Sequence, residues 1–160
     1  MGVLGIDPGR SSGAIAYVWR KGGKLHGKAF YLSNLTEYEI WDLLKQYSKK
    51  ASFVVLEKIH ATPARRQVKG KWFGRGGKAQ WSLGMSFGEL RMAVIASGLR
   101  LEYATPQKWQ KAMRCMSEGD KKVTRTRAQE VFPNIKVTHK NADSLLLAEY
   151  GRRFLSKIVK

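Results

Sequence analysis

The chain has 160 residues and a mass of 18.1 kDa, and 30 Lys and Arg against 12 Asp and Glu give it a formal net charge of +18. A hydrophobic content of 43% excludes intrinsic disorder, and the length predicts one domain over residues 1–160. Cys115 is the single cysteine, which excludes an internal disulfide and a cysteine-based zinc site, so any metal ion must have oxygen ligands. We find neither a signal peptide nor an apolar run of the roughly 18 residues that span a bilayer, so we expect an intracellular protein with no membrane partner.

The excess of positive charge predicts a polyanionic partner. A sequence pI near 10.3 makes the folded chain repel itself, and such a cost is usually retained where the partner carries many negative charges. Nucleic acid is the obvious candidate. The simpler alternative is a basic surface that only keeps the protein soluble.

Three strands are predicted in the first 32 residues. Residues 3–6 are apolar and partly β-branched, and Asp7-Pro8-Gly9 ends this strand at Asp7. Residues 14–18 read as a second strand, and residues 26–32 as a third after a glycine pair. Short turns between them predict an antiparallel meander.

The middle of the chain predicts a helix, a buried strand and a long loop. The predicted helix begins after residue 34 or 36, with Asn34 or Thr36 as its N-cap, and its apolar residues recur at helical spacing through Tyr47. Residues 53–56 are apolar without alternation, as in a strand buried on both faces, and this strand ends at Glu57. Residues 60–79 are rich in Gly, Lys and Arg without periodicity and predict a mobile surface loop, which in a compact domain is usually functional.

The remaining chain is mostly helical. Helices are predicted over residues 83–97, from Pro106 onward, over residues 121–132 and over residues 142–158, with a short strand at residues 99–104. The order of elements predicts an α/β fold with a mixed five-stranded sheet flanked by helices.

Three of the few carboxylates fall at the ends of predicted elements. Asp7 ends the first strand, Glu57 ends the fourth, and Asp143 lies in the first turn of the last helix. If the first and fourth strands are neighbours, Asp7 and Glu57 project from one edge, and a helix across that edge adds Asp143. Carboxylates this close repel one another unless a hard cation such as Mg²⁺ binds them, which is typical of a phosphodiesterase site with two metal ions. Turn formation and helix-dipole interactions are the alternative roles of the single residues.

The three acidic segments resemble those of a known family. These segments are Gly5-Ile6-Asp7-Pro8-Gly9, Val55-Leu56-Glu57 and Ala142-Asp143-Ser144-Leu145-Leu146-Leu147-Ala148-Glu149-Tyr150-Gly151. In this order they resemble the motifs of RuvC-like Holliday junction resolvases. The bacteriophage and chloroplast branch is the most similar, also in residues 106–109 and in the basic helix before Pro133.

The resemblance implies an RNase H-like fold and a homodimer that makes paired, symmetric nicks in four-way DNA junctions with Mg²⁺ or Mn²⁺. It implies Asp7, Glu57 and Asp143 as catalytic metal ligands, with two ions per site. It also implies a bacteriophage, bacterial or organellar setting. Many relatives carry a further acid or His three residues before the last Asp, where this chain has Lys140, so His139 or Asn141 is the expected substitute. A lysine that assists cleavage in relatives corresponds to Lys121 or Lys122, whose alternative role is simple phosphate contact.

A basic loop over about residues 58–80 is the predicted DNA-binding segment, together with the basic helix that follows later. Its positive charges suit phosphates, and its aromatic rings suit unstacked bases at a junction centre. The alternative is a solvated loop whose aromatic residues pack onto the core. The predicted DNA-binding residues are Arg65, Arg66, Lys69, Lys71, Trp72, Phe73, Arg75, Lys78 and, on the basic helix, Arg125.

The helix over residues 83–97 is a candidate dimer seam. Gly84 and Gly88 lie four residues apart, with Met85 and Met92 nearby, and such residues permit close and adaptable packing. Packing against the sheet is the alternative. Two other functions also fit the residues: a nuclease of the same fold acting on RNA or RNA–DNA hybrid, and a catalytically silent protein that binds branched DNA.

Overall fold

The computed structural model describes residues 1–60, 66–68, 71–73, 76–117 and 119–156, with only the backbone for residues 66–68 and 71–73. In this part of the chain, a mixed sheet has the strand order β3-β2-β1-β4-β7. Its strands are β1 (Gly2–Asp7), β2 (Ala14–Lys21), β3 (Lys24–Tyr31), β4 (Ala51–Glu57) and β7 (Leu101–Ala104). β1, β2 and β3 form an antiparallel meander, and β4 pairs in parallel with β1 and β7. The predicted meander and mixed five-stranded sheet are confirmed.

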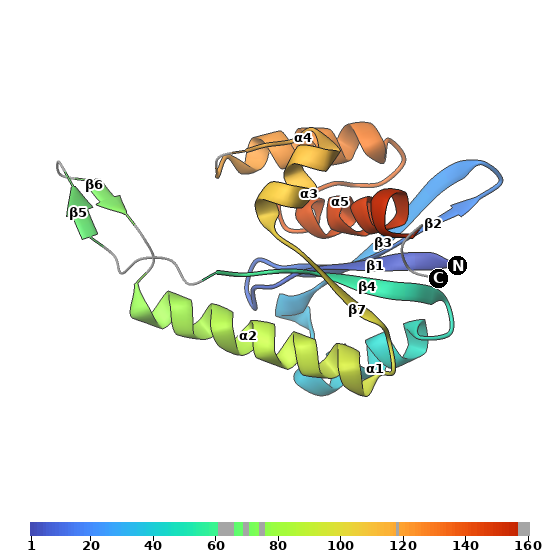
Figure 1. Ribbon diagram of the computed structural model, residues 1–160, viewed down its shortest axis with the longest axis horizontal. Coiled ribbons are helices and arrows are strands. Elements are labelled where there is room, and N and C mark those ends of the chain that lie inside the picture. Colours follow the sequence, from blue (N-terminus) through green and yellow to red (C-terminus); the bar gives the residue numbers. More distant parts are fainter. Residues whose placement is uncertain (61–65, 69–70, 74–75, 118, 157–160) are drawn as a thin grey trace.

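Helices cover both faces of the sheet (Figure 1). α3 (Pro106–Met113), α4 (Lys121–Val131) and α5 (Ala142–Tyr150) lie on one face, and α1 (Glu37–Tyr47) and α2 (Gly77–Ala96) lie on the other. A short 3₁₀ helix, η1 (Leu32–Asn34), precedes α1. No helix in the described part of the chain has the length and hydropathy needed to span a bilayer.

Capping residues explain where the helices begin. Thr36 and Glu39 form a capping box at α1: the Thr36 hydroxyl accepts from the Glu39 amide, and the Glu39 carboxylate accepts from the Thr36 amide at 2.7 Å. Thr105 caps α3, with Pro106 in its first turn. Asp120 caps α4 by accepting from the Lys122 amide at 2.8 Å. Of the two predicted caps of the first long helix, Thr36 is the one used.

The apolar core lies on both sides of the central strands. β1 is buried in every residue, and α5 is buried almost all round because it packs between the sheet and α4. One cluster contains Val55, Trp109 and Leu145, and the other contains Leu4, Leu56 and Leu90. Because both faces of the sheet are covered, no polar residue precedes Asp7 in β1, and residues 53–56 of β4, directly before Glu57, are all apolar and buried.

Two predicted elements differ in the structure. The prediction of a loop over residues 60–79 is wrong in part: β5 (Arg66–Val68) and β6 (Lys71–Phe73) pair as an antiparallel hairpin, and α2 begins at Gly77. Three-residue strands are too short for a recognisable alternation. The prediction of one helix over residues 142–158 is also wrong, because α5 gives way at Gly151 to a π-helical segment, η2 (Gly151–Leu155).

The contact between α5 and β1 yields a stability prediction. A Cβ atom on Gly5 would lie 2.3 Å from the Ser144 carbonyl oxygen and 2.4 Å from the Ala148 amide nitrogen. Because both neighbours are backbone atoms, we expect Gly5→Ala to lower the free energy of unfolding by about 2–4 kcal/mol. Urea denaturation measures this change. Gly77→Ala is the control, since its new methyl group meets no atom within 4 Å, and an equal loss in both variants would contradict the prediction.

Candidate active site

Two of the three predicted carboxylates lie at the ends of neighbouring strands. β1 and β4 run parallel and pair Ile6 with Leu56, so the next residues, Asp7 and Glu57, take adjacent positions at one edge of the sheet. Neighbouring strands are about 4.8 Å apart. Asp7 is buried, with 9% of its surface exposed, and Glu57 is half-buried. The condition set by the sequence analysis, that the first and fourth strands are neighbours, is therefore met.

The third carboxylate approaches this edge from the first turn of α5. The backbone contact of α5 with Gly5 involves Ser144, the residue after Asp143, and β1 ends two residues beyond Gly5 at Asp7. The Oδ1 atom of Asp143 is buried and has no hydrogen-bond partner among the described residues. A buried carboxylate oxygen without a protein donor is suited to a cation.

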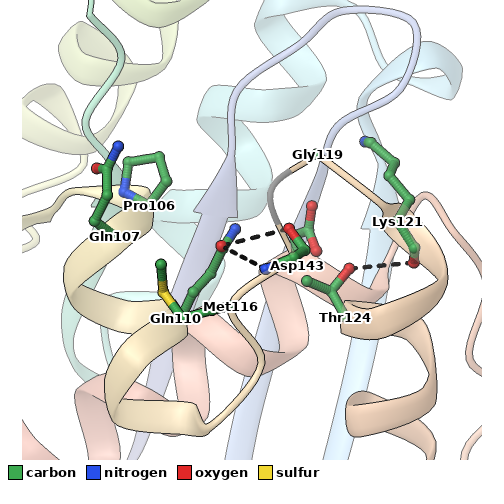
Figure 2. A pocket seen from close by; sticks show the side chains of 9 residues that line it. Pro106, Gln107, Gln110, Met116, Gly119, Lys121, Thr124 and Asp143 are labelled. Atoms are coloured by element: carbon green, nitrogen blue, oxygen red, sulfur yellow. Dashed lines mark hydrogen bonds between the residues drawn. The ribbon is translucent and has the colours of Figure 1, made fainter.

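Asp143 lines a pocket of about 470 Å³ between α3, the start of α4 and the start of α5. Figure 2 shows its carboxylate between Gln110 of α3 and Thr124 of α4, with Lys121 at the rim. Pro106 and Met116 supply apolar parts of the wall. The pocket therefore gives a ligand access to Asp143 beside a cationic side chain.

The three carboxylates share an edge but are not gathered into a closed metal site. In the described ranges, no three His, Cys, Asp or Glu side chains lie close enough together to hold one ion. The donor chemistry nevertheless fits a hard divalent cation, because all three groups offer carboxylate oxygens and Asp143 has one that no protein donor satisfies. Placement and ligand type suit Mg²⁺ or Mn²⁺, while the side-chain positions keep the carboxylates apart.

Trp109 holds Glu57 in place. The indole Nε1 of Trp109 donates a hydrogen bond of 2.8 Å to Glu57 Oε2, and the Trp109 side chain is fully buried. The contact arises because Ala104, at the end of β7, pairs with Glu57, and α3 begins directly after it. The sequence pattern does not connect these two residues, because their contact depends on the pairing of β7 with β4.

The two candidate lysines at the start of α4 lie on different sides of the helix. Lys121 lines the pocket that contains Asp143, whereas Lys122 lines a separate hollow with Arg114 and Arg127. Consecutive helical residues point about 100° apart, which explains the separation. Of the two lysines, Lys121 is therefore the one that shares a pocket with Asp143.

The two candidates for a fourth ligand differ in their surroundings. Asn141 is buried, and its amide holds the preceding turn: Oδ1 accepts from the Thr138 amide at 2.7 Å, and Nδ2 donates to the Lys136 carbonyl at 3.1 Å. His139 is exposed, and its Nε2 lies 3.5 Å from Nη1 of Arg125. The Asn141 amide is thus occupied in stabilising the turn, whereas the His139 side chain is accessible to a metal ion.

The predicted DNA-binding residues are spread over the hairpin, α2 and α4. Lys78 is exposed in the first turn of α2, and Arg125 is exposed on α4. Arg66 lies in β5, and Lys71, Trp72 and Phe73 lie in β6, with side chains outside the described part. Arg65, Lys69 and Arg75 fall outside the described residues. β1 and β4 both run toward the end of the sheet where the hairpin projects (Figure 1).

The single cysteine, Cys115, is unsuited to metal binding at neutral pH. Burial, with the nearby charge of Asp143, raises the pKa of the Cys115 thiol to about 11, while Arg127 opposes this shift. Because metal binding requires the thiolate, Cys115 is protonated and unsuited to a cation at neutral pH.

Solved Holliday junction resolvases share this fold. A RuvC structure from Thermus thermophilus is similar with a TM-score of 0.67 and 18% identity, covering 99% of this chain and 98% of that chain. T. thermophilus RuvC in complex with a Holliday junction substrate has a TM-score of 0.67 and 17% identity, covering 98% and 96%. The fowlpox virus Holliday junction resolvase has a TM-score of 0.52 and 14% identity, covering 99% of both chains.

No family model matches the chain, and no curated protein matches it. The structural likeness at these low identities establishes the fold, so the predicted RNase H-like α/β fold is confirmed. Similarity to the bacteriophage and chloroplast branch in particular stays a prediction.

The bond from Trp109 predicts an effect on metal affinity. Trp109→Phe keeps a buried ring but removes the donor that orients Glu57, so we expect the affinity for Mn²⁺ to fall about 10–100-fold. Isothermal titration calorimetry measures the affinity, and circular dichroism verifies the fold. Trp41→Phe, on α1, is the control for loss of an indole elsewhere. Unchanged Mn²⁺ affinity in a folded Trp109→Phe protein would argue against this positioning role.

Proposed function

We propose that the protein is a structure-selective DNA endonuclease that resolves four-way junctions by divalent-metal-dependent hydrolysis of phosphodiester bonds. The observation that carries the proposal is the placement of Asp7 and Glu57 at adjacent strand ends, with Asp143 in the first turn of the helix packed on β1, in a fold shared with Holliday junction resolvases. The net charge of +18 supports a nucleic acid substrate. A structural neighbour, T. thermophilus RuvC in complex with a Holliday junction substrate, supports a branched substrate.

Asp7, Glu57 and Asp143 are the residues that would hold Mg²⁺ or Mn²⁺, with His139 as a candidate fourth ligand. When bound, the metal would supply activation of a water molecule and stabilisation of the charge on the leaving 3′ oxygen, with two ions per site as the expected number. The orphaned Oδ1 of Asp143 and the fixed Oε2 of Glu57 support this assignment.

The chain's own side chains supply orientation and charge. The Trp109 indole restrains one carboxylate oxygen of Glu57, so the rotamer of this side chain does not have to be selected when substrate arrives. Lys121, which lines the Asp143 pocket, is the lysine whose ammonium group would neutralise charge that develops on the phosphate. Asn141 fixes the turn from which Asp143 emerges.

An exposed apolar face on α2 supports a homodimer. One side of α2 faces the sheet and is buried at Ser86, Leu90 and Val94. The opposite side carries four large, exposed apolar residues: Trp81 (72% exposed), Met85 (49%), Met92 (60%) and Ile95 (49%). Gly84 and Gly88 on this side have open space around the Cβ position. Apolar side chains exposed together on one helix face are typical of a protein contact, and a two-fold dimer would align two sites on two strands.

The carboxylate variants test catalysis separately from binding. We expect Asp7→Asn, Glu57→Gln or Asp143→Asn each to reduce cleavage of a labelled four-way junction at least about 100-fold, because a metal ligand is lost. Junction binding in EDTA should persist, since removing a negative charge does not weaken phosphate attraction. A denaturing gel measures cleavage, and fluorescence anisotropy measures binding.

Parallel assays with a flap, an RNA–DNA hybrid and a plain duplex distinguish the alternatives. Faster cleavage of the hybrid than of the junction would replace the proposal with a nuclease acting on hybrids. Tight junction binding with no cleavage in Mg²⁺ or Mn²⁺ would indicate a catalytically silent binding protein. Substantial nicking by any carboxylate variant would remove that residue from the site.

The apolar α2 face predicts the oligomeric state. Light scattering of the wild-type protein bound to a junction should report a protein mass about twice the chain's 18.1 kDa. Met92→Glu places a charge in the proposed seam and should return the mass to that of one chain. Tyr38→Glu, on the exposed side of α1, is the control and should leave the dimer intact. One wild-type chain per junction would contradict the dimer.

A further inference from the structure

A second hollow with positive charge lies beside the carboxylate edge. It has a volume of about 560 Å³ and separates the turn after β1 from the first turns of α2. Both segments lie at the end of the sheet where β1 and β4 finish (Figure 1). Its polar lining consists of side chains that attract or donate to anions, namely Arg10, Ser11, Ser12, Lys78 and Ser82. No carboxylate is among the described residues that line it.

Arg10 lines this hollow, and its guanidinium is incompletely satisfied. Its Nη1 atom is buried and has no hydrogen-bond partner among the described residues, while Nη2 lies 3.2 Å from Oε1 of Glu37. The Arg10 side chain is 36% exposed and that of Glu37 is 66% exposed, so water screens this ion pair. A guanidinium with an orphaned buried nitrogen and a weakly held partner is suited to a second anion, because its planar fork matches a phosphate.

The turn that carries Arg10 is rigid. The Gly13 amide donates to the Gly9 carbonyl at 2.7 Å, and Gly9 has a φ of +153° that other residues rarely adopt. A Cβ atom on Gly13 would lie 2.2 Å from the backbone oxygen of Asp7. The turn is therefore held against the residue that ends β1, and it presents the exposed hydroxyl groups of Ser11 and Ser12 in a fixed position.

Lys78 completes the positive lining from the opposite side. It is exposed in the first turn of α2 and makes no ion pair with another described residue. The carboxylates of Glu37 and Glu89 face an adjoining hollow, which also borders Arg10 and Lys78. These acids compete with any anion for the two cations but leave the wall of the larger hollow positive.

We propose that this hollow binds one backbone phosphate of the nucleic acid strand that enters the carboxylate site, with Arg10 exchanging Glu37 for the phosphate. Arg10 and Lys78 contact the phosphate from opposite sides, and the Ser11 and Ser12 hydroxyls donate to its oxygens. The choice of nucleic acid as the source of the phosphate rests on the proposed function. Glu37 acts as an internal competitor that limits affinity for non-substrate anions.

Binding of a fluorescent four-way junction in EDTA, measured at several salt concentrations, tests the proposal. Arg10→Gln should weaken binding about ten-fold at low salt and lower the slope of log affinity against log salt by about 0.9, as expected for one lost phosphate contact. Lys78→Gln should act similarly, and the double variant should lose less than the product of the two effects, because both side chains contact one phosphate. Glu37→Gln should instead tighten binding about three-fold, since the competitor is removed.

Arg100 and Glu102 provide matched controls. They form an exposed ion pair of 2.9 Å at the start of β7, so Arg100→Gln and Glu102→Gln make the same charge changes away from the hollow. Equal effects of Arg10→Gln and Arg100→Gln would overturn the subsite and leave the proposed nuclease untouched. Wild-type protein that never cleaves the junction, combined with selective effects of Arg10 and Glu37 on binding, would overturn the nuclease and support the subsite.

Discussion

The site depends on the close approach of α5 to β1 at Gly5. Without a side chain at this position, the backbone of Ser144 and Ala148 rests directly on the central strand. This contact helps to bury α5 almost all round. It involves Ser144, the residue after Asp143, and Gly5, which lies two residues before Asp7. The packing of α5 on β1 therefore also positions Asp7 and Asp143, so a change in this packing alters the positions of both carboxylates.

Residues around the three carboxylates orient them and supply positive charge. Trp109 restrains Glu57 from the start of α3, and Asn141 fixes the turn that leads to Asp143. Lys121 and Arg10 place positive charge on two sides of the carboxylate edge. A basic surface attracts a polyanion broadly, and the carboxylates near the sheet edge suit cations, which is a consistent arrangement for hydrolysis of a phosphodiester.

Much of this arrangement was predictable from local sequence. The apolar runs at residues 3–6 and 53–56 indicated strands that end at Asp7 and Glu57, and Thr36 was one of the two candidate caps of α1. The contact between Trp109 and Glu57 was not predictable, because it joins residues 52 positions apart through the pairing of β7 with β4. The role of Arg10 depends likewise on α2 passing the β1–β2 turn. The hairpin strands and the π-helical end of α5 involve too few residues to produce a periodic pattern.

The most direct measurement maps the nicks in a four-way junction labelled in turn on each strand, in Mg²⁺, on a denaturing gel. A resolvase with one carboxylate site per subunit should cut two strands of like polarity at matching positions, and cleavage should disappear in EDTA. Cuts that are unpaired and equally frequent in a plain duplex of the same sequence would contradict junction resolution. Cleavage that continues in EDTA would contradict the metal site at Asp7, Glu57 and Asp143.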